Sequence, residues 1–267
     1  MMKKTLYILC LFLLGFLLVQ ETNHIYRSDE SSEKQENSSR YVPTANFVSQ
    51  VKTENKSAKK IAYLTFDDGP SENTKMILET LQKKKAVATF FLIGNEITAE
   101  RESIVKQEIK QGNAVGVHTF CHEKNVIYCN AECFFEDYRK TSDVIEKITG
   151  VKPKLHRFPW GSNNCYVSSY VDELHQKLSE MGVRSFDWNV SGEDSIGGVV
   201  AQETIFQNVK KDLCKFDAPI ILLHDSASMK NTVLVLERII DYIRSEGYEF
   251  GTLENREEYM FPESWRK

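Results

Sequence analysis

The chain has 267 residues, of which 41% are hydrophobic and 27% charged, and its formal net charge at pH 7 is −4. This near-neutral balance argues against a nucleic-acid partner, which would require a clustered excess of lysine and arginine. The length and the apolar content are sufficient for one large α/β domain or two small ones, and they exclude a wholly disordered or fibrous chain.

Residues 1–20 have the pattern of a signal peptide or a membrane anchor. Two lysines, Lys3 and Lys4, precede an uncharged apolar run at 6–19. The run is short for a membrane span, which favours a signal peptide, but residues 20–23 lack the small residues that a signal peptidase needs. Both alternatives stay open. Either one places the rest of the chain outside the cytoplasm, and an uncleaved anchor makes the membrane a partner.

Residues 21–58 are predicted to be a flexible polar linker. The stretch Asp29–Ser39 contains no apolar residue, so it cannot bury enough surface to offset the entropy of ordering. The folded domain is expected over residues 59–255. The tail, residues 256–267, carries three aromatic residues and is expected to fold back onto that domain.

From residue 59 onwards, short β-rich apolar runs alternate with stretches of helical period. Strands are expected at Ile61–Phe66, Ala86–Ile93, Ala114–His118, Lys154–Phe158, Val183–Trp188, Pro219–His224 and Tyr248–Thr252. Helices are expected at Glu72–Lys84, Glu96–Gln111, Phe134–Thr149, Tyr170–Met181, Gln202–Cys214 and Thr232–Glu246. This alternation predicts right-handed βαβ units and a single α/β domain with a parallel sheet, open or closed into a barrel.

Five cysteines lie beyond the N-terminal segment: Cys121, Cys129, Cys133, Cys165 and Cys214. An exported chain can pair its cysteines. Because five is an odd number, at least one is free or bridges to another molecule. Between zero and two disulfides are expected, and the sequence does not choose the partners.

Ionisable groups follow five of the predicted strands. In sheets of this kind, ligands bind beyond the carboxyl ends of the strands, where the loops converge on one rim. The rim groups are Asp67 and Asp68 after the first strand, His118 and His122 after the third, Arg157 at the fourth, Asp187 at the fifth and His224 at the sixth.

Two imidazoles and a carboxylate are sufficient to hold a divalent metal and leave positions for water and substrate. His118 and His122 supply the imidazoles. Asp67 and Asp68 are adjacent, and successive side chains of an extended chain point to opposite sides. One aspartate is therefore expected to bind the metal and the other to act as a base.

His224 is the remaining candidate for proton transfer. Asp187 could orient and charge its imidazole, and Arg157 could lower the pKa of a nearby aspartate. A metal, a base and an acid around one cleft are suited to metal-assisted hydrolysis of an acyl group. Trp160 and Trp188 lie beside these groups and could either stack on sugar faces or pack at the rim.

Taken in chain order, these segments resemble the polysaccharide deacetylases of carbohydrate esterase family 4, which share the domain named for the rhizobial nodulation deacetylase. The resemblance covers about residues 60–253, and its most specific motifs are TFDDGP at 65–70 and HTFCH at 118–122. It implies a distorted (β/α)7 barrel that removes acetyl groups from amino sugars. The implied cofactor is Zn²⁺ or another divalent transition metal such as Co²⁺.

The resemblance also implies a role for each motif residue. Asp67 would be the general base, Asp68, His118 and His122 the metal ligands, and His224 the general acid. Arg157 would hold the base, Asp187 would pair with the acid, and Leu222 would line the pocket for the acetyl methyl group.

The expected protein is a monomeric, extracytoplasmic N-deacetylase, either anchored in the cell membrane or secreted, whose first substrate is N-acetylglucosamine in peptidoglycan. N-acetylmuramic acid, chitin oligomers, a biofilm polymer and acetylated xylan stay open as alternative substrates. A second class, a catalytically silent glycan-binding module, also stays open.

Overall fold

The strands form one parallel sheet in the computed structural model, which describes residues 59–265. The order across the sheet is β5-β4-β3-β2-β1-β7-β6, and β8 pairs with the start of β1. The strands are β1 (Ile61–Gly69), β2 (Ala88–Ile93), β3 (Ala114–Thr119), β4 (Leu155–His156), β5 (Arg184–Ser185), β6 (Val190–Ser191), β7 (Ile220–His224) and β8 (Glu249–Phe250).

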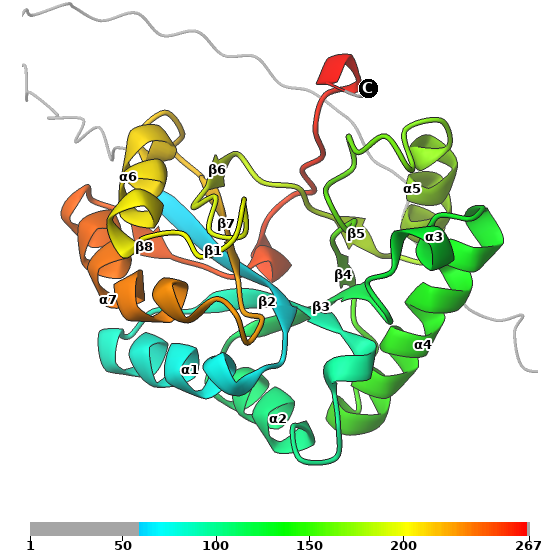
Figure 1. Ribbon diagram of the computed structural model, residues 1–267, viewed down its shortest axis with the longest axis horizontal. Coiled ribbons are helices and arrows are strands. Elements are labelled where there is room, and N and C mark those ends of the chain that lie inside the picture. Colours follow the sequence, from blue (N-terminus) through cyan, green and yellow to red (C-terminus); the bar gives the residue numbers. More distant parts are fainter. Residues whose placement is uncertain (1–58, 266–267) are drawn as a thin grey trace, which may run out of the picture. The chain divides into compact units, whose positions relative to one another are not determined.

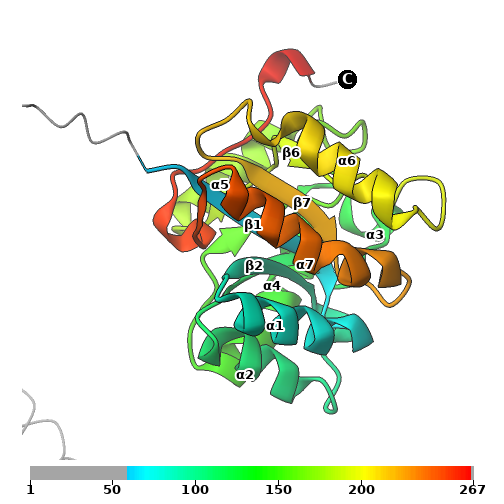
Figure 2. The same cartoon turned by 90° about the vertical axis from the view of Figure 1, so that its left-hand side faces the viewer.

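Helices surround this sheet, and the strands lie in the middle of the domain (Figure 1). The α-helices are α1 (Glu72–Lys84), α2 (Glu102–Lys110), α3 (Lys124–Ile127), α4 (Ala131–Thr149), α5 (Val171–Glu180), α6 (Gln202–Leu213) and α7 (Lys230–Ser245). Three short 3₁₀ helices are η1 (Gly94–Glu96), η2 (Leu253–Asn255) and η3 (Glu263–Trp265). Figure 2 shows α1, α6 and α7 lying over one side of the sheet.

Most predicted elements are confirmed, with shifted ends. The expected helix at 96–111 begins only at Glu102, because the backbone N–H of Asn95 donates to Phe120 O and holds η1 at the rim. The expected strand at 183–188 shortens to β5, and a strand that the sequence analysis missed, β6, follows directly.

The sheet is a curled, open barrel. Its two end strands are β5 and β6, and within residues 59–265 neither pairs with the other. The C-terminal tail packs beside β5 instead: Tyr259 bridges to Phe186, and Tyr259 O accepts a hydrogen bond from Asp187 N at 2.7 Å. The expected distorted barrel in a single domain is confirmed, as is a tail that folds back.

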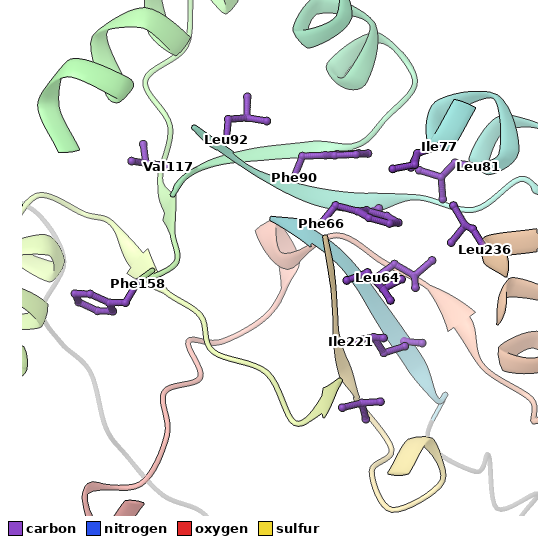
Figure 3. Close-up of a cluster of buried hydrophobic side chains, with 14 of the residues drawn as sticks. Leu64, Phe66, Ile77, Leu81, Phe90, Leu92, Val117, Phe158, Ile221 and Leu236 are labelled. Carbon is purple, nitrogen blue, oxygen red and sulfur yellow. The ribbon is translucent and has the colours of Figure 1, made fainter. Parts of the chain in front are cut away.

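Strand β1 shows how one segment builds both the core and the site. Leu64 and Phe66 point towards α1 and α7, where they join a buried cluster with Leu81 and Leu236 (Figure 3). Alternate residues of a strand face opposite sides of the sheet. Residues 65 and 67 therefore point to the other side, where they meet the buried guanidinium of Arg157.

One disulfide lies within the described part of the chain and joins Cys129 to Cys133, where α4 begins. Cys121, Cys165 and Cys214 are free thiols. This pairing agrees with the expected range of zero to two disulfides.

The predicted signal peptide or anchor at 1–20 and the predicted linker at 21–58 lie outside the described residues. Within residues 59–265, no helix is both long enough and apolar enough to cross a bilayer.

Glu108 on α2 gives a prediction about stability. It is fully buried, its two carboxylate oxygens have no hydrogen-bond partner, and burial together with the charge of Asp225 raises its pKa well above 4.5. The folded state therefore binds a proton that the unfolded state has released, so stability should fall as pH rises above 4.5. One such proton changes the free energy of unfolding by up to about 1.4 kcal/mol per pH unit.

Glu108→Gln should remove this component and be more stable than wild type at pH 8, whereas exposed Glu79→Gln should keep the wild-type slope. Urea denaturation between pH 4.5 and 8 measures the difference. Equal slopes for Glu108→Gln and wild type would contradict the assignment of a buried neutral carboxyl.

Candidate active site

A cleft of about 590 Å³ opens at the carboxyl ends of β1, β3, β6 and β7. Eight predicted site residues line it: Asp67, Asp68, His118, His122, Trp160, Trp188, Leu222 and His224. The other two, Arg157 and Asp187, are buried and do not line the cleft. The rim predicted from the strand ends is therefore a real cleft, and its groups come from segments far apart in the chain.

Asp68, His118 and His122 form a cluster suited to a metal ion. One ligand atom from each lies within 4.8 Å of the others, and Asp68 Oδ1 is 3.5 Å from both His118 Nε2 and His122 Nε2. Asp68 Oδ1 is buried and has no hydrogen-bond donor among the described residues. A buried carboxylate oxygen without a partner is costly unless a cation occupies the space beside it.

The protonation of His118 fits the same reading. Its Nδ1 lies 2.9 Å from Arg157 O, so Nδ1 carries the hydrogen and Nε2 presents a lone pair to the cluster. Burial lowers the pKa of His118 to about 3, although the charge of Asp68 opposes this shift. The ring is therefore neutral at physiological pH, as a metal ligand must be.

The backbone at the cleft is strained in a way that places these side chains. The non-glycine residues Asp68, His122, Trp160 and Glu193 have φ between 50° and 73°, in the left-handed region. Asp68 occupies a bulge where the register between β1 and β2 shifts, so it turns to the same cleft as Asp67 rather than to the opposite side. Such strain concentrates at functional sites.

Asp67 is held by Arg157 in a buried ion pair. Arg157 Nη1 donates to Asp67 Oδ1 at 2.8 Å and to Thr65 Oγ1 at 2.7 Å, and both charged side chains are almost fully buried. Arg157 Nε donates to Phe186 O at 2.8 Å, and the guanidinium lies 4.3 Å from the ring centre of Phe91. Burial raises the pKa of Asp67, although Arg157 opposes this rise, and the higher pKa makes the carboxylate a better base.

His224 lies beside Asp67 on the neighbouring strand, because the two are partners in the β1–β7 register. Its Nδ1 is 2.8 Å from Asp194 Oδ1, and its backbone N–H donates to Asp194 Oδ2 at 2.9 Å. Burial alone would lower the pKa of His224, but Asp194, with help from Asp67 and Asp68, raises it to about 9. The imidazole is therefore charged at neutral pH, with Nε2 towards the cleft and 3.4 Å from Ser195 Oγ.

The predicted pairing of Asp187 with His224 is wrong. The carboxylate of Asp187 accepts hydrogen bonds from Ser162 N, Ser162 Oγ and Phe261 N, at 2.9, 2.5 and 2.7 Å. Asp187 follows β5 at one end of the sheet, whereas β6 pairs with β7 and carries Asp194 to His224. The sequence signal that was missed is the short run Val190–Ser191, which forms a strand of its own. The acidic pair Glu193 and Asp194 follows that strand.

Asp137 is a second residue that the sequence analysis missed. It lies on the buried face of α4, where a carboxylate among apolar residues was the available signal. Its oxygens accept hydrogen bonds from Thr119 Oγ1, Phe120 N and Cys121 N, at 2.6, 2.7 and 3.2 Å. Asp137 thereby fixes the turn that carries His122.

The three predicted substrate-binding residues differ in their surroundings. Leu222 is 5% exposed and forms part of the cleft floor. Trp160 is 42% exposed, and its ring lies 4.6 Å from that of His122. Trp188 packs edge-on against Phe261 of the tail at 5.0 Å, so its rim-packing role is visible while Trp160 keeps an open face.

The rim of this parallel α/β sheet carries a cluster of one aspartate and two histidines suited to a cation, a buried carboxylate suited to act as a base, and a charged imidazole. Together these groups define a hydrolase with a candidate metal centre. The family model "Polysaccharide deacetylase" matches residues 54–185. Peptidoglycan-N-acetylglucosamine deacetylase of Bacillus cereus is 34% identical over 210 residues, which are 76% of this chain and 72% of that protein. The chain belongs to the polysaccharide deacetylases of carbohydrate esterase family 4, as the motifs indicated.

Two further similarities extend this result. Peptidoglycan-N-acetylmuramic acid deacetylase PdaC of Bacillus subtilis is 32% identical over 201 residues, which are 75% of this chain and 39% of that protein. The catalytic domain of peptidoglycan N-acetylglucosamine deacetylase from Eubacterium rectale superposes with a TM-score of 0.69 at 31% identity, covering 75% of this chain and 91% of that one. The (β/α)7 fold is thus shared with a solved deacetylase domain.

Asp137→Ala should weaken metal binding without touching a ligand. Loss of the carboxylate frees the turn at 119–122, and residues that orient metal ligands typically contribute about 10- to 100-fold in affinity. Isothermal titration with Zn²⁺ or Co²⁺ measures the change, with Asp143→Ala as a matched control on the exposed face of the same helix. Equal affinity in both variants would mean that His122 is positioned without Asp137.

Proposed function

We propose that this protein is a zinc-dependent N-deacetylase whose substrate is N-acetylglucosamine in peptidoglycan. The observation that carries the proposal is the buried, unpartnered Asp68 Oδ1 between two imidazoles, beside a base and a charged imidazole. The names of similar proteins support the substrate, because several are peptidoglycan-N-acetylglucosamine deacetylases. We also propose that residues 1–20 direct the domain out of the cytoplasm and that residues 21–58 are a polar linker, which joins the domain to the membrane if residues 1–20 stay uncleaved.

A zinc ion held by Asp68, His118 and His122 would supply Lewis acidity to the acetyl carbonyl and to water. Arg157 occupies Asp67 Oδ1, which leaves Oδ2 to take a proton from the attacking water. His224 carries a proton on Nε2 and gives it to the leaving nitrogen, so acetate and a free amine are the products. Leu222 offers an apolar floor for the acetyl methyl group.

The same geometry weighs against a catalytically silent binding module. A module needs neither a base held by a buried arginine nor an imidazole charged by a buried aspartate, and both cost free energy to build. The muramic acid alternative has one observation in its favour, the similarity to PdaC, so it belongs in the test.

Acetate release from defined glycans tests the proposal. The wild type should release acetate from peptidoglycan strands, lose this activity with a chelator and regain it with Zn²⁺. Asp67→Asn should bind zinc as wild type does and slow turnover by about 10²- to 10⁴-fold, the usual contribution of a general base. Mass spectrometry of the products then shows which amino sugar lost its acetyl group.

Three results would contradict this proposal. Glycan binding without chelator-sensitive acetate release would favour the silent module. Release from acetylated xylan alone would indicate an esterase, and loss of zinc in Asp67→Asn would mean that the two aspartates have exchanged roles.

The raised pKa of His224 predicts the alkaline side of the pH profile. Activity requires the protonated imidazole, so kcat/KM should fall as pH rises through a value at or slightly below about 9, since a cation on Asp68 offsets the contribution of that carboxylate. Asp194→Asn removes the main raising charge and should move this limb down by about 1–3 pH units, the usual effect of an adjacent opposite charge. Asp187→Asn should leave the limb in place, and a shift there instead of in Asp194→Asn would restore the pairing inferred from the motif.

A further inference from the structure

A strip of aromatic and cationic side chains leads away from the cleft on the side of α3. It consists of Trp160, Tyr166 and Lys124. The Trp160 ring is 4.6 Å from the ring of the metal-site residue His122 and 5.9 Å from the ring of Tyr166. Lys124 Nζ then lies 4.8 Å from the centre of the Tyr166 ring and donates to Tyr166 Oη at 3.2 Å. The strip is therefore continuous with the catalytic cleft.

The two aromatic rings of the strip are open to solvent although they are fixed from behind. Trp160 is 42% and Tyr166 41% exposed. Buried Tyr128 packs against Trp160 at 6.2 Å and donates from its hydroxyl to Pro159 O at 3.1 Å, which anchors the turn that carries Trp160. Asn164 Oδ1 accepts from Tyr166 N at 2.9 Å. Rigid, half-exposed aromatic rings present flat faces of the kind on which sugar rings stack.

The charge at the far end of the strip has no counterpart. Within residues 59–265, Lys124 forms no ion pair with a carboxylate, unlike the lysines that are paired on α1, α4 and α5. The opposite side of the cleft has the other sign, because Glu193 lines it after β6, at the far end of the sheet. A bound glycan with an anionic neighbour would thus be oriented with that group towards Lys124.

We propose that this strip is a subsite for the sugar next to the one that loses its acetyl group, and that Lys124 binds a carboxylate carried by that neighbour. The inference rests on the proposed function and adds an anionic glycan strand to its substrate class. In peptidoglycan the neighbour of N-acetylglucosamine is a muramic acid. Its lactyl carboxylate is free when the peptide is absent, and the stem peptide supplies carboxylates when it is present.

The test compares KM values for three soluble glycans: strands stripped of peptide, strands that carry peptide, and neutral chitin oligomers. Lys124→Ala should raise KM for the anionic strands, relative to chitin oligomers, by about 2- to 5-fold, the range of an exposed ion pair, with kcat little changed. This rise in KM should shrink at high salt, because salt screens the ion pair. Lys124→Arg keeps the positive charge and should restore the wild-type KM for the anionic strands. The matched control is Lys152→Ala. Lys152 is an exposed lysine just before β4, so it lies at the amino ends of the strands, whereas the cleft lies at their carboxyl ends.

The comparison of strands identifies the source of the carboxylate. A change on stripped strands assigns the lactyl group, and a change confined to peptide-bearing strands assigns the stem peptide. Tyr166→Ala should raise KM for all three glycans, because it removes a stacking surface rather than a charge.

Two outcomes would overturn the inference. One is a KM ratio in Lys124→Ala equal to that in Lys152→Ala, and the other is an equal rise for chitin oligomers, which would make Lys124 only a local support for Tyr166. Neither outcome affects the proposed function, which is contradicted instead if the wild type releases no chelator-sensitive acetate from any of the three glycans.

Discussion

The buried pair of Arg157 and Asp67 is the interaction on which the remainder of the site depends. Placing two charges in the interior is costly, and it is tolerated only when the geometry is good and the remaining donors are satisfied. Here the guanidinium donates to a carboxylate, a hydroxyl and two backbone carbonyls, those of Phe186 and Asp187. Removing one partner of such a pair typically costs about 3–5 kcal/mol, so the position of Asp67 and the stability of the fold depend on the same contact.

Arg157 contacts both Asp67 and His118, and it also links the strands that carry them. Its side chain holds Asp67, the proposed base, while its backbone carbonyl accepts the Nδ1 hydrogen of His118 and so sets which nitrogen faces the candidate metal site. The sheet register adds the third group, because β1 pairs with β7 and places His224 beside Asp67. Asp67, His118 and His224, the proposed base, metal ligand and acid, are therefore placed by one arginine and by the sheet register together.

The strained backbone at the cleft results from the number of side chains that must meet there. Side chains from neighbouring residues must reach a single point, and an unstrained strand would turn half of them away. The left-handed backbone at Asp68, His122 and Trp160 brings them back to the cleft. The surrounding hydrogen bonds, such as those from the turn at 119–122 to Asp137, keep these conformations in place.

The sequence by itself determined the class of fold and the identity of most rim groups. Apolar runs of strand length end at Asp67, His118 and His224, and in a parallel sheet such ends meet at one rim whatever the details of packing. Only the tertiary structure decided which carboxylate charges His224. Asp187 and Asp194 both follow short strands, but the pairing of β6 with β7 depends on contacts between distant segments, which local patterns do not encode. The role of Asp137 was hidden for the same reason, since its partners lie on another element of the fold.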